Sequence, residues 1–385
     1  MINKEHELMC SYMYKILKSK KSSRAILSLV CSWVWDNAED LNLDVEDPEL
    51  YDLLTNYPKA FEEKEVSRDL YIETRQQVIK LLQSKKTKNF TDAHHDYQNL
   101  NILANSLNLD SVDIEIFSIF YRYATNDPFE SFIDQMSKRY FTSNEIISAL
   151  TGFDRKTIVE KTSREGRLVQ MGLLHPEGST SGYLQNCFSI PPAVKRGLQS
   201  ATLGKDDLHH HFLGKSSPST LSWEDFEHIG GIRDQLASFI KKSVQKQERG
   251  INILLWGDPG TGKTEFCKTL ATYLEIELFS ICEADEDGKD PSREERLDAL
   301  KLAQSLLREQ NTSMLLFDEM DDLLASDSER IFAPPRKLSK VFVNRIFEQN
   351  PIPTIWTLND IDLLDEAILR RMSLAIEFRK PPRKN

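Results

Sequence analysis

Hydrophobic positions in the first hundred residues fall into short runs separated by acidic connectors. Residues 12–17 and 24–35 have the apolar spacing of amphipathic or buried helices, and an acidic connector follows at residues 39–49. The pair His94-His95 lacks the spaced companions that a metal site needs, so an exposed or core role is favoured for both. Residues 1–105 are therefore predicted to form a helical N-terminal region without chemistry of its own.

The pattern between residues 106 and 200 is more specific. Thr142 and Glu145 have the spacing of a capping box, which predicts a short helix over residues 145–150. Asp154 can cap a second helix that ends at Gly172. The apolar face of that helix would carry Ile158, Val159, Leu168, Val169 and Met171. Residues 173–175 and 183–190 flank the turn-rich stretch 176–182, which predicts a two-stranded hairpin.

Two helices followed by such a hairpin resemble a winged-helix domain. Domains of this kind often read DNA with the second helix, which here would carry Arg155, Lys156, Lys161, Arg164 and Arg167. Acidic residues lie between these basic ones and dilute their charge. An interaction or packing module is therefore favoured over a DNA reader, and DNA contact stays the alternative.

Residues 201–220 are rich in Ser, Gly, Lys and His, which predicts a linker between domains. The triplet His209-His210-His211 lies within it. Three consecutive side chains cannot all point at one ion, so a functional metal site is disfavoured there.

After this linker, an apolar run at residues 253–256 predicts a buried parallel strand that leads into the sequence GDPGTGKT at residues 257–264. This is the P-loop (Walker A) pattern G-x-x-x-x-G-K-[ST], in which backbone amides face phosphates. Lys263 would supply a cation to the β- and γ-phosphates of ATP, and Thr264 a hydroxyl to Mg²⁺. The predicted nucleotide-binding positions of this loop and the start of its helix are Asp258, Pro259, Gly260, Thr261, Gly262, Lys263, Thr264 and Glu265. Residues 265–274 continue at helical spacing.

A second apolar run at residues 313–317 ends at the adjacent carboxylates Asp318 and Glu319. In a P-loop protein, Asp318 is placed to hold Mg²⁺ and Glu319 to polarise the attacking water. An exposed helix cap is the plain alternative, and the agreement of strand, loop and spacing disfavours it. The sequence thus predicts an ATPase of the P-loop class.

A third apolar strand at residues 353–358 ends at Asn359, residues 363–372 are predicted to be helical, and residues 374–378 form a last core strand. Over about residues 221–380 the chain resembles the AAA+ ATPases. The resemblance implies that Asn359 is the sensor 1 residue that orients the water. It also implies an arginine finger that reaches the neighbouring subunit's site; either Arg370 or Arg371 matches, and Arg371 is preferred. The segment 223–231 resembles the one that contacts adenine, through Ile229 and Gly230 with His228 beside them.

Two departures from the family pattern stand out. The loop that in ring unfoldases carries an aromatic residue reads SICEADEDGK here, at residues 280–289, so threading of a polypeptide by that grip is in doubt. The acidic part, residues 283–287, is interpreted as a solvated loop. The helical lid of the family does not follow residue 378, which favours a fragment of something longer over an ATPase with weakened nucleotide control.

Composition narrows the setting. The net charge of −11 argues against coating nucleic acid or acidic membranes by bulk electrostatics. The most apolar run, residues 25–35, is shorter than the roughly 20 residues that span a bilayer. A reducing, cytoplasmic setting is expected because the cysteines are scattered and form no C-x-x-C pair; they are Cys10, Cys31, Cys187, Cys267 and Cys282.

The predicted fold is an α/β P-loop core at residues 221–385, with a parallel sheet between helices, preceded by an all-α region, a winged helix at 106–200 and the linker. Its expected cofactors are ATP and Mg²⁺, and the ATP is expected to be hydrolysed between subunits of a ring or open spiral. The leading function is ATP-driven remodelling of a protein partner bound by the N-terminal region. The alternatives are a DNA-associated ATPase recruited by the winged helix and a nucleotide-gated scaffold with little turnover.

Overall fold

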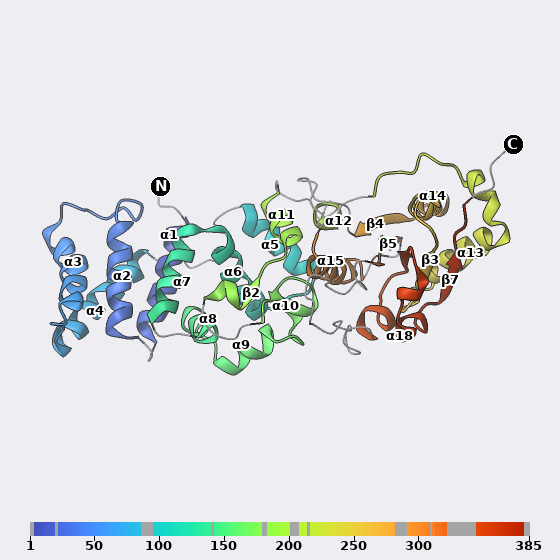
Figure 1. Cartoon of the computed structure of the whole chain (residues 1–385). Helices are drawn as coiled ribbons and strands as arrows, with labels where there is room; N and C mark the ends of the chain where they lie inside the picture. Colours follow the sequence, from blue (N-terminus) through green and yellow to red (C-terminus); the bar gives the residue numbers. More distant parts are fainter. Residues whose placement is uncertain are drawn as a thin grey trace. The chain divides into compact units, whose positions relative to one another are not determined.

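The structure is a computed structural model. It describes residues 4–19, 22–85, 95–139, 142–178, 183–200, 208–213, 216–281, 291–308, 310, 312–321 and 344–380. The chain divides into two compact units, Met1–Leu203 and Gly204–Asn385 (Figure 1).

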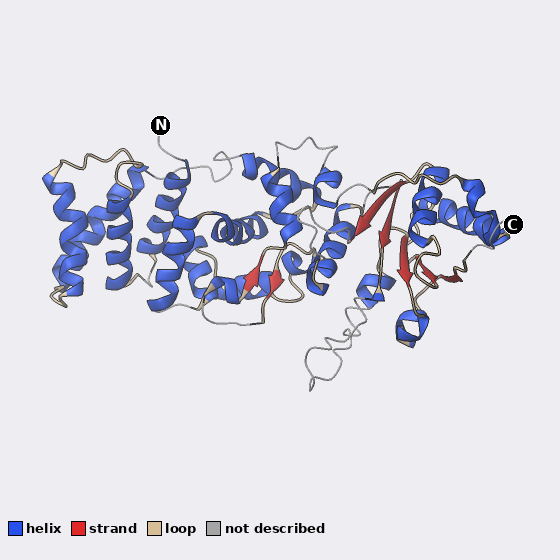
Figure 2. Ribbon diagram, turned by 45° about the horizontal axis from the view of Figure 1, so that its top comes forward, coloured by secondary structure: helices blue, strands red, loops and turns tan. Residues whose placement is uncertain are grey.

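The first unit is built of helices (Figure 2). They are α1 (Lys4–Lys18), α2 (Arg24–Asp36), α3 (Pro48–Glu62), α4 (Arg68–Lys85), α5 (His95–Ser106), α6 (Ser111–Thr125), α7 (Asp127–Arg139), α8 (Ser143–Thr151), α9 (Arg155–Thr162), α10 (Arg167–Gln170) and α11 (Pro192–Gln199). Helix α2 is strongly apolar, and most of its side chains are buried. The predicted helical N-terminal region is confirmed. None of the helices described is long and apolar enough to cross a membrane.

The predicted winged-helix segment folds differently in detail. Helix α8 begins where expected, with the Thr142 amide donating to Glu145 at 3.2 Å, and Asp154 caps α9 by accepting from the Thr157 amide at 2.9 Å. The prediction of one continuous second helix was wrong. The chain leaves α9 at Ser163, which is extended, and α10 starts after Gly166. A Cβ at Gly166 would lie 2.2 Å from a backbone oxygen of α9, so this close approach requires glycine.

The predicted hairpin is reduced to a two-residue pairing. Strand β1 (His175–Pro176) runs antiparallel to β2 (Phe188–Ser189), and the 3₁₀ turn η1 (Leu184–Asn186) occupies much of the expected second strand. The winged-helix assignment therefore stays a prediction.

Two of the five basic residues considered for DNA contact are engaged inside this unit. Lys161 lies 2.5 Å from Asp110 and 2.9 Å from the fully buried Asp113, and Arg167 lies 3.7 Å from the same Asp113. Arg167 also donates to the backbone oxygens of Leu107 and Asn108. These side chains tie α9 and α10 to the start of α6, which leaves less positive charge for a nucleic acid.

The second unit is organised by a five-stranded parallel sheet. Its strands are β3 (Asn252–Trp256), β4 (Glu277–Ile281), β5 (Ser313–Phe317), β6 (Thr354–Leu358) and β7 (Leu374–Glu377), in the order β4-β5-β6-β3-β7. The three central strands are buried almost throughout, as expected for runs of apolar residues covered on both faces. Because all strands run in one direction, the residues that follow β3, β5 and β6 meet at one edge.

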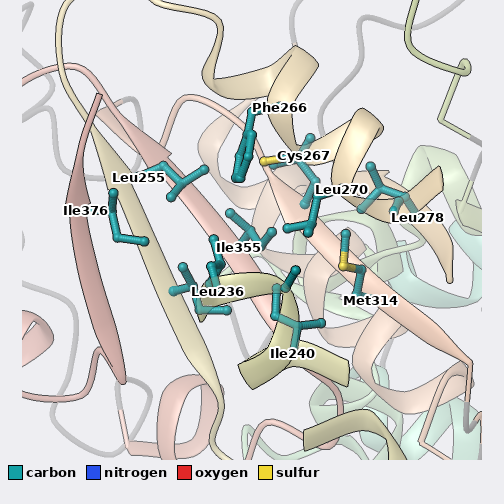
Figure 3. Packing of buried hydrophobic residues seen from close by; sticks show 14 of the residues in the cluster. Leu236, Ile240, Leu255, Phe266, Cys267, Leu270, Leu278, Met314, Ile355 and Ile376 are labelled. Carbon is teal, nitrogen blue, oxygen red and sulfur yellow. The ribbon is translucent and has the colours of Figure 1, made fainter. Parts of the chain in front are cut away.

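Helices cover both faces of this sheet. One face packs against α13 (Gly231–Gln245), α14 (Lys263–Leu274) and the turn η2 (Trp223–Ile229); Figure 3 shows Phe266 and Leu270 of α14 against Leu255 and Ile355 of the sheet. The other face packs against α15 (Arg293–Leu306) and the π-helical turn Asn344–Glu348. The predicted α/β core, a parallel sheet between helices, is confirmed.

Two local predictions in this unit were wrong. Part of the expected linker forms α12 (Leu208–Leu213), which packs on β4 and α15, with Leu213 against the sheet core and His210 3.1 Å from Glu277. The helix expected at 363–372 is only α18 (Glu366–Leu369), after the 3₁₀ turn η4 (Ile361–Leu363), because the Asp365 side chain caps a new helix start. Among the residues described, no three His, Cys, Asp or Glu side chains are grouped so that they could hold a metal ion, and the histidine triplet is no exception.

Candidate functional site

The glycine-rich loop after β3 holds a conformation that its sequence requires. Gly257, Gly260 and Gly262 all have positive φ angles, of 145°, 75° and 90°. A Cβ at Gly257 would lie 2.1 Å from the backbone oxygen of Phe378, so the loop passes directly against the end of β7. The Thr261 hydroxyl closes the loop by donating to the Asp258 oxygen at 2.9 Å. The loop leads into the amino end of α14, where backbone amides and the helix dipole favour an anion.

Lys263 folds back over this loop. Its ammonium group donates to the backbone oxygens of Gly257 at 2.6 Å and Asp258 at 3.2 Å, and to Oδ1 of Asn359 at 3.0 Å. Burial lowers the pKa of Lys263 below its usual range, and the nearby carboxylates, Asp321 first among them, oppose that shift. A cation held among backbone oxygens fits the neutralisation of phosphate charge.

Asp318 joins the P-loop to the neighbouring strands. Its Oδ2 accepts from the Thr264 hydroxyl at 2.8 Å and its Oδ1 from the Thr357 hydroxyl at 2.5 Å. A hydroxyl and a carboxylate in contact are hard oxygen ligands of the kind that Mg²⁺ prefers. The structure therefore brings together the two predicted metal-binding residues, on α14 and after β5.

Glu319 lies beside this pair with its side chain exposed. Its backbone has φ 54°, a left-handed value that only a few per cent of non-glycine residues adopt. The Thr357 hydroxyl accepts from the Glu319 amide at 2.8 Å and holds that conformation. Such a conformation at the end of a strand presents the carboxylate to solvent at the edge where the phosphate loop lies.

Asn359, at the end of β6, is oriented by a third carboxylate. Asp321 accepts from the Asn359 amide at 3.1 Å and from its side-chain nitrogen at 3.2 Å. The side-chain oxygen of Asn359 is thereby directed to Lys263. The structure thus places the predicted sensor 1 residue next to the P-loop lysine.

Three residues of this site were missed by sequence reasoning. Thr357 donates to the Asp318 carboxylate and accepts from the Glu319 amide, and Asp321 orients the asparagine. The buried Arg296 of α15 donates to the backbone oxygens of the residues at 318 and 319, at 3.0 Å for the second. The D-E-x-D spacing was a signal for Asp321. A buried threonine in an apolar strand and an arginine in a helix 22 residues earlier offer no such signal.

A cavity of about 560 Å³ opens beside the loop. It is lined by loop residues and by the residues that follow β6 and β7, namely Trp256, Gly257, Asp258, Pro259, Thr261, Asn359, Asp360, Ile361, Glu377, Phe378, Arg379 and Lys380. The predicted binding residues Asp258, Pro259 and Gly260 form the exposed rim of the loop. Glu265 faces away from the rim and accepts from the Ser219 hydroxyl at 2.8 Å, so it holds the preceding segment rather than the cavity wall.

The segment predicted to contact the base packs on the P-loop helix. Phe226 of η2 contacts Phe266 of α14 with ring centroids 5.2 Å apart, and it lies 3.7 Å from the Cβ position of Gly262. Ile229 is half-buried in the same cluster, whereas His228 and Gly230 are exposed. These contacts hold η2 on the P-loop helix, and the contact of residues 228–230 with the base stays a prediction.

The two candidate finger residues lie elsewhere, after α18. Arg370 has 72 % of its side chain exposed and contacts Glu366 at 2.5 Å. Arg371 is 23 % exposed; its Nε lies 2.8 Å from Glu348, and its Nη1 donates to the Ala367 oxygen. These contacts hold the two arginines against α18 and the π-helical turn.

The parallel sheet, the glycine loop and the paired hydroxyl and carboxylate together define a P-loop nucleotide-binding protein. Residues 253–380 match the family model described as "ATPase family associated with various cellular activities (AAA)". This stretch of the chain is therefore an AAA+ ATPase domain.

Several curated proteins are similar to this chain. Fidgetin-like protein 1 of Drosophila melanogaster is 25 % identical over 272 residues, which cover 65 % of this chain and 49 % of the relative. Proteasome-activating nucleotidase of Archaeoglobus fulgidus is 26 % identical over 254 residues, or 58 % of this chain and 62 % of the relative. The chain thus spans about half to three-fifths of these relatives.

Among solved structures, the FIGL-1 AAA domain in complex with ADP is 21 % identical and covers 42 % of this chain and 57 % of that one. Its TM-score of 0.32 is too low to add to the comparison.

Proposed function

We propose that the chain binds ATP with Mg²⁺ and hydrolyses it at a site shared between subunits, and that hydrolysis drives remodelling of a protein partner bound by the N-terminal unit. The observation that carries the proposal is the chain of contacts from Thr264 through Asp318 to Thr357, with the exposed carboxylate of Glu319 beside it. It joins the phosphate loop to the two strands that carry the remaining polar groups.

Binding follows from the loop and Lys263. The loop amides at the start of α14 would hold the phosphates, and the ammonium of Lys263 would exchange its backbone oxygens for phosphate oxygens. Thr264 and Asp318 would hold Mg²⁺, which when bound neutralises charge on the phosphates. Residues 228–230, next to the loop, are the proposed contacts of the base.

Hydrolysis needs a base and a group that orients water. Glu319 is exposed at the loop edge and is the proposed base, while the side-chain oxygen of Asn359, fixed by Asp321, is the proposed acceptor for a water hydrogen. An arginine would offset charge in the transition state. A neighbouring subunit that supplies Arg370 or Arg371 would complete the site, and such an arginine accelerates other NTPases by about 10³–10⁵.

Remodelling is the use of ATP that the two-unit organisation favours. The first unit is a separately packed helical body with its own core, suited to holding a partner while the second unit cycles. A pure nucleotide-gated scaffold would have no use for an exposed Glu319. DNA recruitment is disfavoured by the internal ion pairs of Lys161 and Arg167.

Steady-state ATP turnover over a protein-concentration series tests the enzymatic part. Wild type is compared with Lys263→Ala and Glu319→Gln, and with Lys241→Ala, an exposed lysine of α13, as a control for loss of charge. We expect specific activity that rises with concentration, control activity equal to wild type and loss of turnover in the two site variants. ATP binding without turnover at any concentration would refute hydrolysis and support the scaffold.

The remodelling part has its own test. Glu319→Gln loaded with ATP should retain a partner that Lys263→Ala does not, and wild type with ATP should then change the oligomeric state of that partner. An unchanged partner would remove remodelling from the proposal. Retention of DNA instead, weakening steeply with salt, would establish the DNA-associated alternative.

A further inference from the structure

A cation lies on the apolar side of α15. Arg296 is 4 % exposed and shares the buried stripe of this helix with Leu300, Ala303 and Leu307. An apolar residue would be the ordinary occupant of such a position, because the stripe packs on the sheet. Arg296 also lies in the first turn of the helix, where the helix dipole disfavours positive charge. Its presence there is therefore explained by what it binds and not by helix packing.

Arg296 binds the chain where β5 ends. Its Nη2 donates to the backbone oxygen of Asp318 and, at 3.0 Å, to that of Glu319. Its guanidinium group lies over the ring of the buried Phe317, 4.9 Å from the ring centroid. One side chain thus contacts three consecutive residues, and the last two are the proposed metal ligand and the proposed base. A guanidinium suits this task, since its charge is permanent and its donors are fixed in one plane.

These bonds hold a backbone turn of an unfavourable kind. Glu319 has φ 54°, a value that residues other than glycine rarely adopt. Strand β6 holds the turn from one side: the Thr357 hydroxyl accepts from the Glu319 amide, and the Met320 amide donates to the Thr357 backbone oxygen, both at 2.8 Å. Arg296 holds the carbonyl oxygens at 318 and 319 from the side of α15. Two different elements therefore fix the amides and the carbonyl oxygens of the same turn.

On these contacts, and resting on the proposed hydrolysis by Glu319, we propose that Arg296 is a positioning residue for the reaction. It acts through the backbone at 318 and 319, which it holds so that the Glu319 carboxylate is presented at the edge where the phosphate loop lies. The rate of hydrolysis then depends on the position of α15, a helix that contributes no residue of the P-loop or of the acidic pair.

Substitution of Arg296 by Met removes the donors and keeps a long, unbranched side chain in the buried site. Loss of one charged donor predicts a kcat about 10- to 100-fold lower, with the Kd for ATP within about twofold of wild type. Arg296→Lys keeps the charge and part of the reach, so its kcat should lie between those of Arg296→Met and wild type. Arg308→Met, at an exposed position just after the same helix, is the control and should keep wild-type turnover. Steady-state turnover with Mg²⁺, binding of a fluorescent ATP analogue and urea unfolding of the full chain give the three readouts.

A double variant separates positioning from general damage. Single-turnover hydrolysis of bound ATP is measured with enzyme in excess for Glu319→Gln, with and without Arg296→Met. If Arg296 acts through Glu319, the second substitution should lower the residual rate by less than about threefold, because no base is left to be positioned. A substitution that disturbs the loop or the packing would lower the residual rate as much as it lowers the rate of wild type, and it would weaken ATP binding in both backgrounds.

Three results would overturn the assignment: a folded Arg296→Met variant with wild-type kcat, a loss that resides in the Kd for ATP, or equal losses of rate in the two backgrounds. Should Arg296→Met fail to fold, Arg296→Lys is compared in the same two backgrounds under the same criteria. Failure of the proposed function has a different signature. A wild type without turnover, or a Glu319→Gln variant as active as wild type, would remove the base itself, whereas the three results above leave hydrolysis by Glu319 intact.

Discussion

Replacement of Thr357 by Val tests whether the hydroxyl that joins the Asp318 carboxylate to the Glu319 backbone amide organises the site. Thr357 is buried, and Val keeps its shape while removing the donor to Asp318 and the acceptor for the Glu319 amide. A hydrogen bond to a charged group contributes about 1.5–3 kcal/mol, and a buried amide left unpaired costs about 1–3 kcal/mol. If the lost hydrogen bond to Asp318 stabilises the transition state, in which the carboxylate must be fixed, kcat drops about 10- to 150-fold.

The assay is steady-state ATP turnover with Mg²⁺ at a protein concentration where wild-type specific activity has levelled off. Thr357→Ser is the matched control, since it keeps the hydroxyl and loses one buried methyl, worth about 1 kcal/mol of stability. We expect Thr357→Ser to have a kcat near that of wild type and Thr357→Val to have a reduced kcat. The KM for ATP should change much less. A Val variant within about threefold of wild type, or a Ser variant as impaired as Val, would refute the reasoning.

The remaining predictions concern the loop and the packing of each unit. Gly257→Ala should abolish nucleotide binding in a filter or fluorescence assay, because its Cβ would lie 2.1 Å from the Phe378 oxygen, whereas Gly260→Ala, with open space and φ 75°, should cost about 1 kcal/mol. Equal effects would contradict the geometry. Asp113→Asn should destabilise the N-terminal unit by about 2 kcal/mol in urea unfolding, because its carboxylate is fully buried while its cationic partners reach solvent; an unchanged midpoint would contradict this. Burial lowers the pKa of His209, so below about pH 6.5 the unfolded chain binds a proton that the folded chain does not. Thermal stability should therefore fall on acidification through that range, and less so in His209→Gln.

The strands and the phosphate loop could be predicted because their physical constraints are local. A parallel strand buried on both faces must be an uninterrupted apolar run, and the runs before Gly257, Asp318 and Asn359 satisfy this. The loop needs glycine wherever φ is positive, so its pattern survives in the sequence. Edge strand β7 has three of its four residues exposed, so its apolar pattern is weaker than that of the central strands.

What could not be predicted depends on contacts distant along the chain. The periodicity of α9 continues into α10, so nothing local reveals the break that a close approach at Gly166 permits. Helix α12 has a linker-like composition and is stabilised by contacts with the sheet unit, among them Leu213 on the sheet core and His210 on Phe279 of β4. Arg296 follows an ordinary amphipathic helical pattern, and only folding brings it to the backbone oxygens of the two acidic residues after β5. In each case tertiary contact outweighs local composition.

Strand β3 joins the two halves of the proposed shared site. Its last residues lead into the P-loop at Gly257, and its first residue, Asn252, holds the turn that carries Arg370. The strand is bonded on both sides, to β6 and β7, and buried along its length. A buried, doubly paired strand of five residues moves as a rigid element, because bending it would break ladder bonds in low-dielectric surroundings. A rotation of one subunit that moves its own P-loop must therefore move the arginine it offers to its neighbour, which would couple adjacent sites without a change inside the sheet.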